Sequence, residues 1–106
     1  MAWIYLVIAG LFEVAFAVSL KMANSGGGWS WRLAFLVSVI LSFVFLERAL
    51  ASVPVGTAYA VWTGIGAVGV ALVGIVVFKD VTSLPRLAFL ALLIVSMIGL
   101  KLTSPG

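Results

Sequence analysis

Four apolar runs, each close to the length of a bilayer-crossing helix, decide what this chain can fold into. They cover about residues 2–22, 31–51, 55–78 and 84–103, and the third carries no charged residue. A helix needs about 20 apolar residues to cross the hydrocarbon core, and in lipid it satisfies its own backbone hydrogen bonds. The runs are too long for strands and apolar on every side. We therefore predict an all-α membrane protein, a single domain over residues 1–106 with four transmembrane helices.

Short breaks separate the four runs. Asn24–Gly28 is a glycine-rich turn followed by Trp29 and Trp31, which are typical of a membrane interface, and Pro54 suits the start of the third helix. Because all the loops are short, any function must lie within the bilayer or at a helix contact. The first run lacks the basic leading region of a removed signal peptide and carries an acid at its middle.

The residue inventory excludes most catalytic and cofactor chemistry. The chain has no cysteine and no histidine, and its only acids are Glu13, Glu47 and Asp80. Thiolate metal sites, iron–sulfur clusters and the usual histidine base are therefore ruled out. We expect no enzyme activity, no cofactor and no metal site. The six Lys and Arg residues are scattered, so no nucleic-acid surface is expected.

The same cations give only a weak indication of orientation. Four spans place both termini on one side, and four of the six cations then lie on the other side. By the positive-inside rule this split mildly favours termini outside, and it leaves the absolute orientation open. The four cations are Lys21, Arg32, Lys79 and Arg86, against Arg48 and Lys101.

Glu13 is the strongest candidate for a functional residue. It lies about 18 Å into the first helix, at 1.5 Å per residue, which places it near the bilayer middle. A charged acid there costs about 2.5–3.5 kcal/mol, so it should not face lipid. Exclusion of water favours the protonated form and a nearby cation favours the ionised form, so the group can hold either. The structural alternative is a protonated glutamic acid that donates a hydrogen bond between helices.

Small and aromatic residues surround this acid on its own helix. Ala9, Gly10 and Ala17 lie within four residues of Glu13, and Phe16 lies three residues after it. The spacing predicts a cavity beside the carboxylate with an aromatic wall. Small residues are equally typical of close helix packing, and the two interpretations are compatible.

The third run adds aromatic residues and glycines. Tyr59, Trp62 and Gly66 follow one another at spacings of three and four, so they share a stripe whose aromatic faces could attract a cation. Gly64 and Gly66 weaken the helix and predict a kink or hinge, with close helix contact as the alternative. Ser42 in the second run could bond a carboxylate, although a lone membrane serine usually bonds its own helix.

The fourth run carries small residues that suit helix–helix contact. Four helices of this length cannot easily enclose a hydrated pathway, so we expect an oligomer with the site at its interface. The small residues are Ala88, Ala91, Ser96 and Gly99.

Over essentially its whole length the chain resembles the small multidrug resistance family. The resemblance is carried by Gly10-x-x-Glu13, by the continuous segment Pro54–Gly66 and by Gly99-Leu100-Lys101. Within it, Trp62–Gly66 and the final Gly-Leu-Lys are most similar to the guanidinium-exporter branch rather than the quaternary-ammonium branch.

This resemblance implies an antiparallel dimer in the inner (plasma) membrane, as a homodimer or as a heterodimer with a paralogue. It implies a proton-coupled antiporter in which a small organic cation, guanidinium or a substituted guanidinium, competes with protons for Glu13. Ser42 and Trp62 would hydrogen-bond and orient that acid, Gly64 and Gly66 would form the hinge, and Lys101 would support the site. The implied substrate pocket consists of Gly10, Phe16, Ser42, Tyr59, Trp62 and Thr63.

Two departures from the branch keep alternatives open. The branch usually has tryptophan where this chain has Phe16, and the loss of an indole N–H predicts a roomier pocket that admits bulkier cations. Glu47-Arg48 stands where the branch commonly has uncharged residues, as an interfacial ion pair or a contact with a non-identical partner. The alternatives to guanidinium export are a broad exporter of quaternary ammonium and other hydrophobic cations, a channel, and a non-transporting membrane assembly subunit.

Overall fold

Residues 2–103 form four long helices joined by turns and contain no strand. The computed structural model describes these residues, so Met1 and residues 104–106 of the predicted domain lie outside the described part. All four helices are long and apolar enough to cross a membrane. The predicted all-α membrane fold is confirmed. The helices are α1 (Ala2–Met22), α2 (Trp29–Leu50), α3 (Val55–Val76) and α4 (Leu84–Thr103), with a wide turn, η1 (Ala23–Gly27), between the first two.

Glycines shape the turn between α1 and α2. Gly26 and Gly28 have φ angles of 90° and 83°, in the left-handed region that residues with a Cβ rarely adopt. Gly27 lies where a Cβ would collide with the ring of Trp31. The chain reverses within this glycine-rich turn, and α2 begins at Trp29, earlier than the predicted residue 31.

The α3 helix ends at Val76, earlier than the predicted residue 78. The chain turns back over the helix end, where the Asp80 backbone N–H donates to the Gly74 carbonyl (2.9 Å). Lys79 takes a φ of 59° at this reversal. The connection is therefore folded against α3 before α4 begins.

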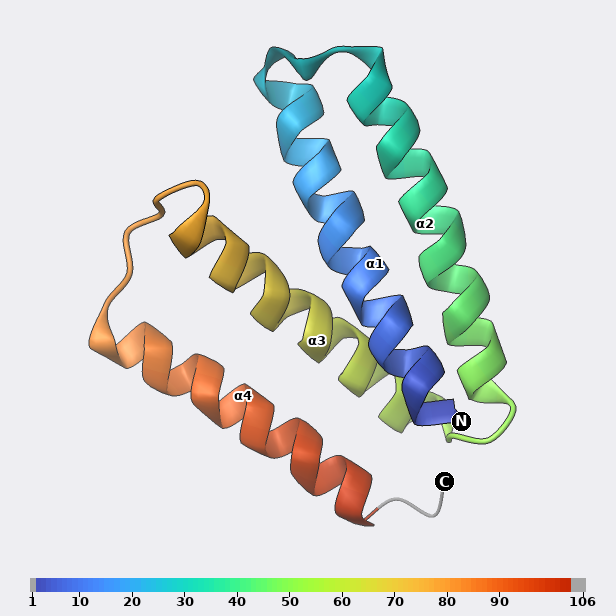
Figure 1. Cartoon of the computed structure of the whole chain (residues 1–106). Helices are drawn as coiled ribbons and strands as arrows, with labels where there is room; N and C mark the ends of the chain where they lie inside the picture. The colour runs from blue at the N-terminus through green and yellow to red at the C-terminus, as the bar shows by residue number, and fades with distance from the viewer. Residues whose placement is uncertain (1, 104–106) are drawn as a thin grey trace.

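The four helices lie in a row in the order α2, α1, α3, α4. α1 packs against both α2 and α3, and α4 packs against α3. Figure 1 shows α1 and α2 as an antiparallel hairpin, with α3 beside α1 and α4 beyond it. The molecule extends 45 × 35 × 17 Å. Since a helix with its side chains is about 10–12 Å wide, this slab is at most about two helices deep, and one copy of the chain cannot surround a site.

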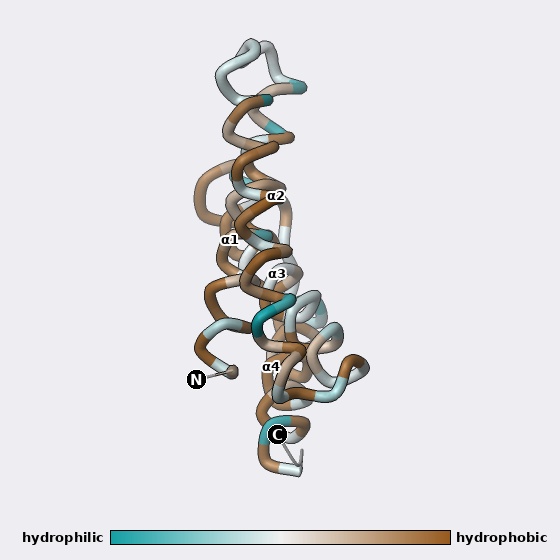
Figure 2. Tube along the Cα trace, turned by 90° about the vertical axis from the view of Figure 1, so that its right-hand side faces the viewer, coloured by the Kyte–Doolittle hydropathy of each residue, from teal (hydrophilic) through white to brown (hydrophobic). Residues whose placement is uncertain are grey.

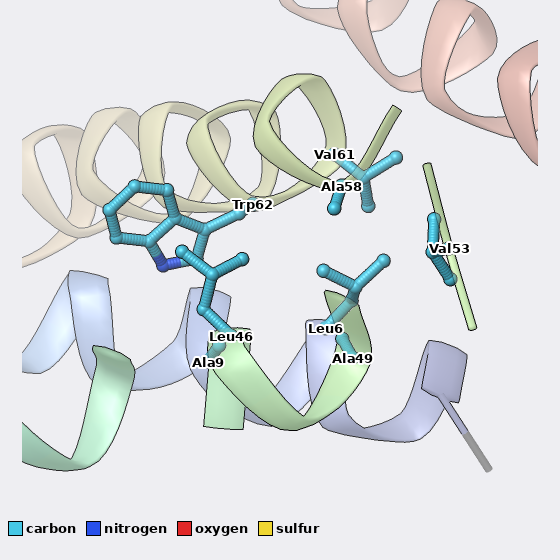
Figure 3. Packing of buried hydrophobic residues seen from close by; sticks show 8 residues of the cluster. All are labelled: Leu6, Ala9, Leu46, Ala49, Val53, Ala58, Val61 and Trp62. Carbon is cyan, nitrogen blue, oxygen red and sulfur yellow. The ribbon is translucent and has the colours of Figure 1, made fainter. Parts of the chain in front are cut away.

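The packed core lies where α1, α2 and α3 meet, and Figure 3 shows its side chains pointing toward one another from these segments. No residue of α4 within 84–103 is buried. Figure 2 shows apolar residues along all the helices and more hydrophilic ones at the turn between α1 and α2. The core cluster consists of Leu6, Ala9, Leu46, Ala49, Val53, Ala58, Val61 and Trp62.

Candidate functional site

Glu13 lies near the middle of α1, with its carboxylate against α3. A Cβ at Gly66 would collide with that carboxylate, so only a glycine lets the two helices approach this closely. The residue is half-buried, and its Oε1 atom is buried and accepts no hydrogen bond from any described residue. A buried acceptor without a partner costs about 1–3 kcal/mol. A proton, a bound cation or a donor from another chain would remove this cost.

Ser42 and Trp62 form a hydrogen-bonded relay that ends beside this acid. The Trp62 indole N–H donates to Ser42 Oγ (3.0 Å), and the Ser42 hydroxyl donates to the Ala9 carbonyl (2.7 Å). Ser42 is 0% exposed and Trp62 is 7% exposed. In an α-helix the carbonyl of Ala9 also accepts the backbone N–H of Glu13. The relay therefore fixes α2 and α3 to the helical turn that carries Glu13.

The resemblance implied that Ser42 and Trp62 bond the carboxylate directly. In this structure their donors go to the Ala9 carbonyl and to Ser42 Oγ instead. Within one subunit the two residues thus position the turn around Glu13 rather than the carboxylate itself. A direct contact with the acid in an assembled dimer stays a prediction.

Aromatic rings gather around Trp62. The Tyr59 ring lies edge-on to it with centroids 5.6 Å apart, and the Phe43 ring lies edge-on at 5.1 Å. Trp62 is buried, whereas Tyr59 and Phe43 remain 43% and 46% exposed. The rings of the predicted Tyr59–Trp62 stripe therefore do meet, and exposed aromatic surface continues outward from the buried indole.

Phe16 is half-buried and packs edge-on against Phe35 of α2, with ring centroids 5.8 Å apart. It leaves α1 one helical turn after Glu13, so it lies on the same side of the helix. A phenyl ring has no N–H donor, and the wall that it forms is purely apolar.

The predicted glycines lie at close helix contacts. A Cβ at Gly10 would collide with the Ile65 side chain of α3, and a Cβ at Gly64 would come within 2.6 Å of Met97 Sδ of α4. Both glycines are buried, and α3 runs unbroken from Val55 to Val76. The structure therefore gives these glycines a packing role, and the hinge at Gly64 and Gly66 stays a prediction.

Two predicted residues have partners other than Glu13 in this structure. Thr63 is exposed and donates to the Tyr59 carbonyl of its own helix (2.7 Å). Lys101 Nζ lies 5.4 Å from the centre of the Trp3 ring, beside a groove of about 190 Å³ between α1, α3 and α4. Trp3 is about 15 Å along α1 from Glu13, at 1.5 Å per residue. A role for either residue at the site stays a prediction.

Sequence reasoning missed two contributors, the Ala9 carbonyl and the Phe43 ring. A backbone carbonyl carries no sequence signal, because every residue has one. Phe43 is one of many apolar residues in α2, and only the packing of α2 against α3 shows that it meets Trp62.

The sequence is similar to those of known transport proteins. The family described as "Small Multidrug Resistance protein" matches residues 1–93. The chain is 49% identical over 104 residues to the guanidinium exporter of Escherichia coli K12, covering 98% of this chain and 99% of that protein. It is 49% identical to the guanidinium exporter of Yersinia pestis, with 98% and 100% covered. The guanidinium exporter of Salmonella typhimurium is 43% identical, with 98% and 99% covered.

Proposed function

Since this chain belongs to the small multidrug resistance family, we propose that it is a proton-coupled antiporter that exports guanidinium or small substituted guanidiniums. Relatives named guanidinium exporter align with 98% of the chain at 49% identity. We place the protein in the plasma membrane, where a proton gradient directed inward could drive export.

The observation that carries the proposal is the buried, unpartnered Oε1 of Glu13 against Gly66. An ionised carboxylate here attracts an organic cation, and a guanidinium can pair with it through two parallel hydrogen bonds. A protonated carboxylate is neutral and holds no cation well. Proton and substrate therefore exclude each other at one site, and exchange between them couples their movements without a separate proton channel.

The surrounding residues give this exchange its selectivity and position. The aromatic faces of Tyr59 and Trp62 add cation–π attraction. The relay from Trp62 through Ser42 keeps the Glu13 turn in place while its occupant changes. Because a single slab-shaped subunit leaves the site open, a second, antiparallel copy completes it, and bending at Gly64 and Gly66 alternates access between the two sides.

Transport by purified protein in liposomes tests the proposal. With an outward-directed guanidinium gradient opposing a proton gradient, the wild type should carry the two ions in opposite directions. Glu13→Gln should reduce this coupled transport to the background of empty liposomes. Glu47→Gln, which removes an exposed acid near the end of α2, is the matched control and should leave transport intact. Normal coupled transport by Glu13→Gln would contradict the proposal and favour an assembly subunit, and current independent of pH would favour a channel.

The second candidate is a broad exporter of quaternary ammonium and other hydrophobic cations, and the apolar wall formed by Phe16 and Phe35 favours it. Phe16→Trp should raise the preference for guanidinium over tetramethylammonium by about 2- to 10-fold, the value of one hydrogen bond. Proteoliposome currents with both cations measure this ratio. A wild type that already carries tetramethylammonium as well as guanidinium would support the broad exporter.

A further inference from the structure

A cavity of about 110 Å³ lies between α1 and α3, toward the end that carries the loop before α4. About 10–15 Å³ of such space holds one water molecule, so this cavity has room for a small organic guest. Figure 1 shows α1 and α3 spreading apart toward this end. The wall contains the ring of Phe78 and two opposite charges, Lys21 and Asp80.

The cavity continues the helix contact at which Glu13 lies. On α1, Ala17 lines the cavity one helical turn after Glu13. On α3, Val70 lines it one turn after Gly66. Lys21 is about 12 Å from Glu13 along α1, at 1.5 Å per residue. A guest in the cavity would therefore lie between one and two helical turns from the carboxylate that the proposed exchange uses.

Asp80 is held at this cavity by the reversal of the chain over the end of α3. Its backbone N–H donates to the Gly74 carbonyl (2.9 Å), and a Cβ at Gly74 would collide with its carboxylate. The carboxylate makes no hydrogen bond or ion pair with another residue in 2–103. Arg86, near the start of α4, donates instead to the Val81 carbonyl (3.0 Å). The cavity wall therefore contains a negative charge without a partner in the subunit.

Lys21 places a cation on the aromatic ring rather than on this carboxylate. Its Nζ lies 5.1 Å from the centre of the Phe78 ring, within the distance of about 6 Å at which a ring attracts a cation. Among the described residues, Lys21 is the only cation in the wall, since Lys79 and Arg86 do not line the cavity. The Lys21 side chain is exposed, so it can move into water.

The backbone at this end of the molecule also favours a cation. α1 ends at Met22 and α3 ends at Val76, both beside the cavity. The C-terminus of a helix carries about −0.5 of an elementary charge. Two helix ends, a carboxylate and an aromatic face thus attract positive charge to the same place.

We propose that this cavity is a second binding site for guanidinium-type cations, in which the guest replaces the Lys21 ammonium on the Phe78 ring and pairs with Asp80. A guanidinium group is planar, stacks on aromatic faces and is more weakly hydrated than an ammonium, so it displaces the lysine. Its edge donates two parallel hydrogen bonds to a carboxylate. The inference rests on the proposed function and deepens it, because cations gathered at this end of α1 reach Glu13 more often.

Other small guests fit the cavity less well. An anion would meet the Asp80 carboxylate and two helix C-termini, which all repel it. A metal ion takes several protein ligands, and residues 2–103 contain no cluster of three His, Cys, Asp or Glu side chains. One carboxylate beside one aromatic ring is instead suited to a flat organic cation.

Asp80 is the only aspartate in the chain, so a ¹³C label on the aspartate carboxyl gives a single NMR reporter. In Glu13→Gln protein in lipid nanodiscs, added guanidinium chloride should shift this signal along a saturating curve. Sodium chloride should shift it little, because sodium neither stacks nor donates hydrogen bonds. Glu47 is then the only glutamate, lies outside the cavity and serves as the control, whose labelled signal should not saturate. No saturation at Asp80, or an equal response to sodium or at Glu47, would overturn the proposal.

Removing the lysine tests whether guest and side chain compete. Lys21→Gln should lower the guanidinium concentration that half-saturates the Asp80 signal by about 2- to 5-fold, the value of one exposed cation–π contact. Lys79→Gln removes the same charge from a residue outside the wall and should change it less. Weaker binding in Lys21→Gln, or an equal gain in Lys79→Gln, would contradict the exchange.

Transport kinetics test the use of the site. Asp80→Asn should raise the KM for guanidinium in liposomes by about 2- to 5-fold, the value of one exposed charge pair, and should leave kcat unchanged. Asp80→Glu keeps the charge and should keep a KM near that of the wild type. A lower kcat with unchanged KM in Asp80→Asn, or an equal KM in the two variants, would contradict a cation site at Asp80.

The two proposals fail in distinguishable ways. If the Asp80 signal does not respond to guanidinium while wild-type protein still exchanges guanidinium for protons, the second site is wrong and the proposed function stands. If the Asp80 signal saturates as expected while wild-type protein moves no cation, the site stands and the function is wrong.

Discussion

The first three helices and α4 are similarly apolar, but only the first three bury side chains against one another. α1, α2 and α3 share a buried core and the Trp62–Ser42–Ala9 relay. In α4 no described residue is buried; the helix packs against α3, and its Lys101 reaches the Trp3 ring of α1. Its Ser96 hydroxyl bonds only the Leu92 carbonyl of its own helix (2.9 Å).

The difference is between three helices that bury one another's side chains and a fourth helix, α4, whose described side chains all stay at least partly exposed. The three packed helices hold Glu13, its neighbouring glycine and the relay in a fixed arrangement. Gly99 is one of the small α4 residues predicted to suit helix contact. A Cβ added there would have no neighbour within 4 Å. A helix that is apolar all round and unburied is left for lipid or for another chain.

The largest expected effect is a loss of transport when one methyl group is added at the packed contact between α1 and α3. Gly66→Ala places a Cβ against the Glu13 carboxylate. It should lower coupled guanidinium transport by about 10- to 100-fold, since overpacking costs about 1–3 kcal/mol. Gly56→Ala, at the start of α3 with nothing within 4 Å of the added atom, is the control and should transport normally. Equal activity of the two variants would show that Glu13 does not depend on this close approach.

Truncating a leucine should destabilise the protein in the core shared by α1, α2 and α3, and should have little effect on α4. Leu46→Ala, at a position 2% exposed in the shared core, should lower the free energy of unfolding in detergent by about 2–5 kcal/mol. Leu92→Ala, at a position 57% exposed on α4, should change it by no more than about 0.5 kcal/mol. Comparable losses in both variants would mean that α4 is packed as tightly as the other helices.

A smaller effect is expected from removing one hydroxyl. Ser42→Ala leaves the buried Trp62 N–H without its acceptor and should destabilise the protein by about 1–3 kcal/mol. Ser96→Ala removes a hydroxyl that bonds only its own helix, so its thermal stability should stay near that of the wild type. Thermal unfolding in detergent measures both. A Ser42→Ala variant as stable as Ser96→Ala would mean that the relay contributes little.

Much of the fold could be predicted because the membrane imposes a simple rule. Length and lack of charge located four helices, and the glycines at 26 and 28 located the first turn. Glu13 stood out because an acid is costly at that depth. The aromatic stripe of Tyr59 and Trp62 followed from helical spacing alone, and the two rings do meet.

The packing order of the helices could not be predicted. In a soluble helix the polar face reveals the buried one, but these helices are apolar all round, so nothing marked α1 as central and α4 as peripheral. Ser42 illustrates the same limit. Its sequence context favoured a bond within its own helix, as Ser19 and Ser96 make, and only the packing of α1 against α2 gives it the Ala9 carbonyl.

Proton release on substrate binding tests the central claim most directly. Guanidinium added to purified wild-type protein in weakly buffered detergent solution should acidify the medium, because the cation displaces a proton from Glu13. Its affinity should fall as the pH is lowered, since protonation removes the charge that binds it, and Glu13→Gln should release nothing. Guanidinium that binds with unchanged affinity across pH and without proton release would contradict the account.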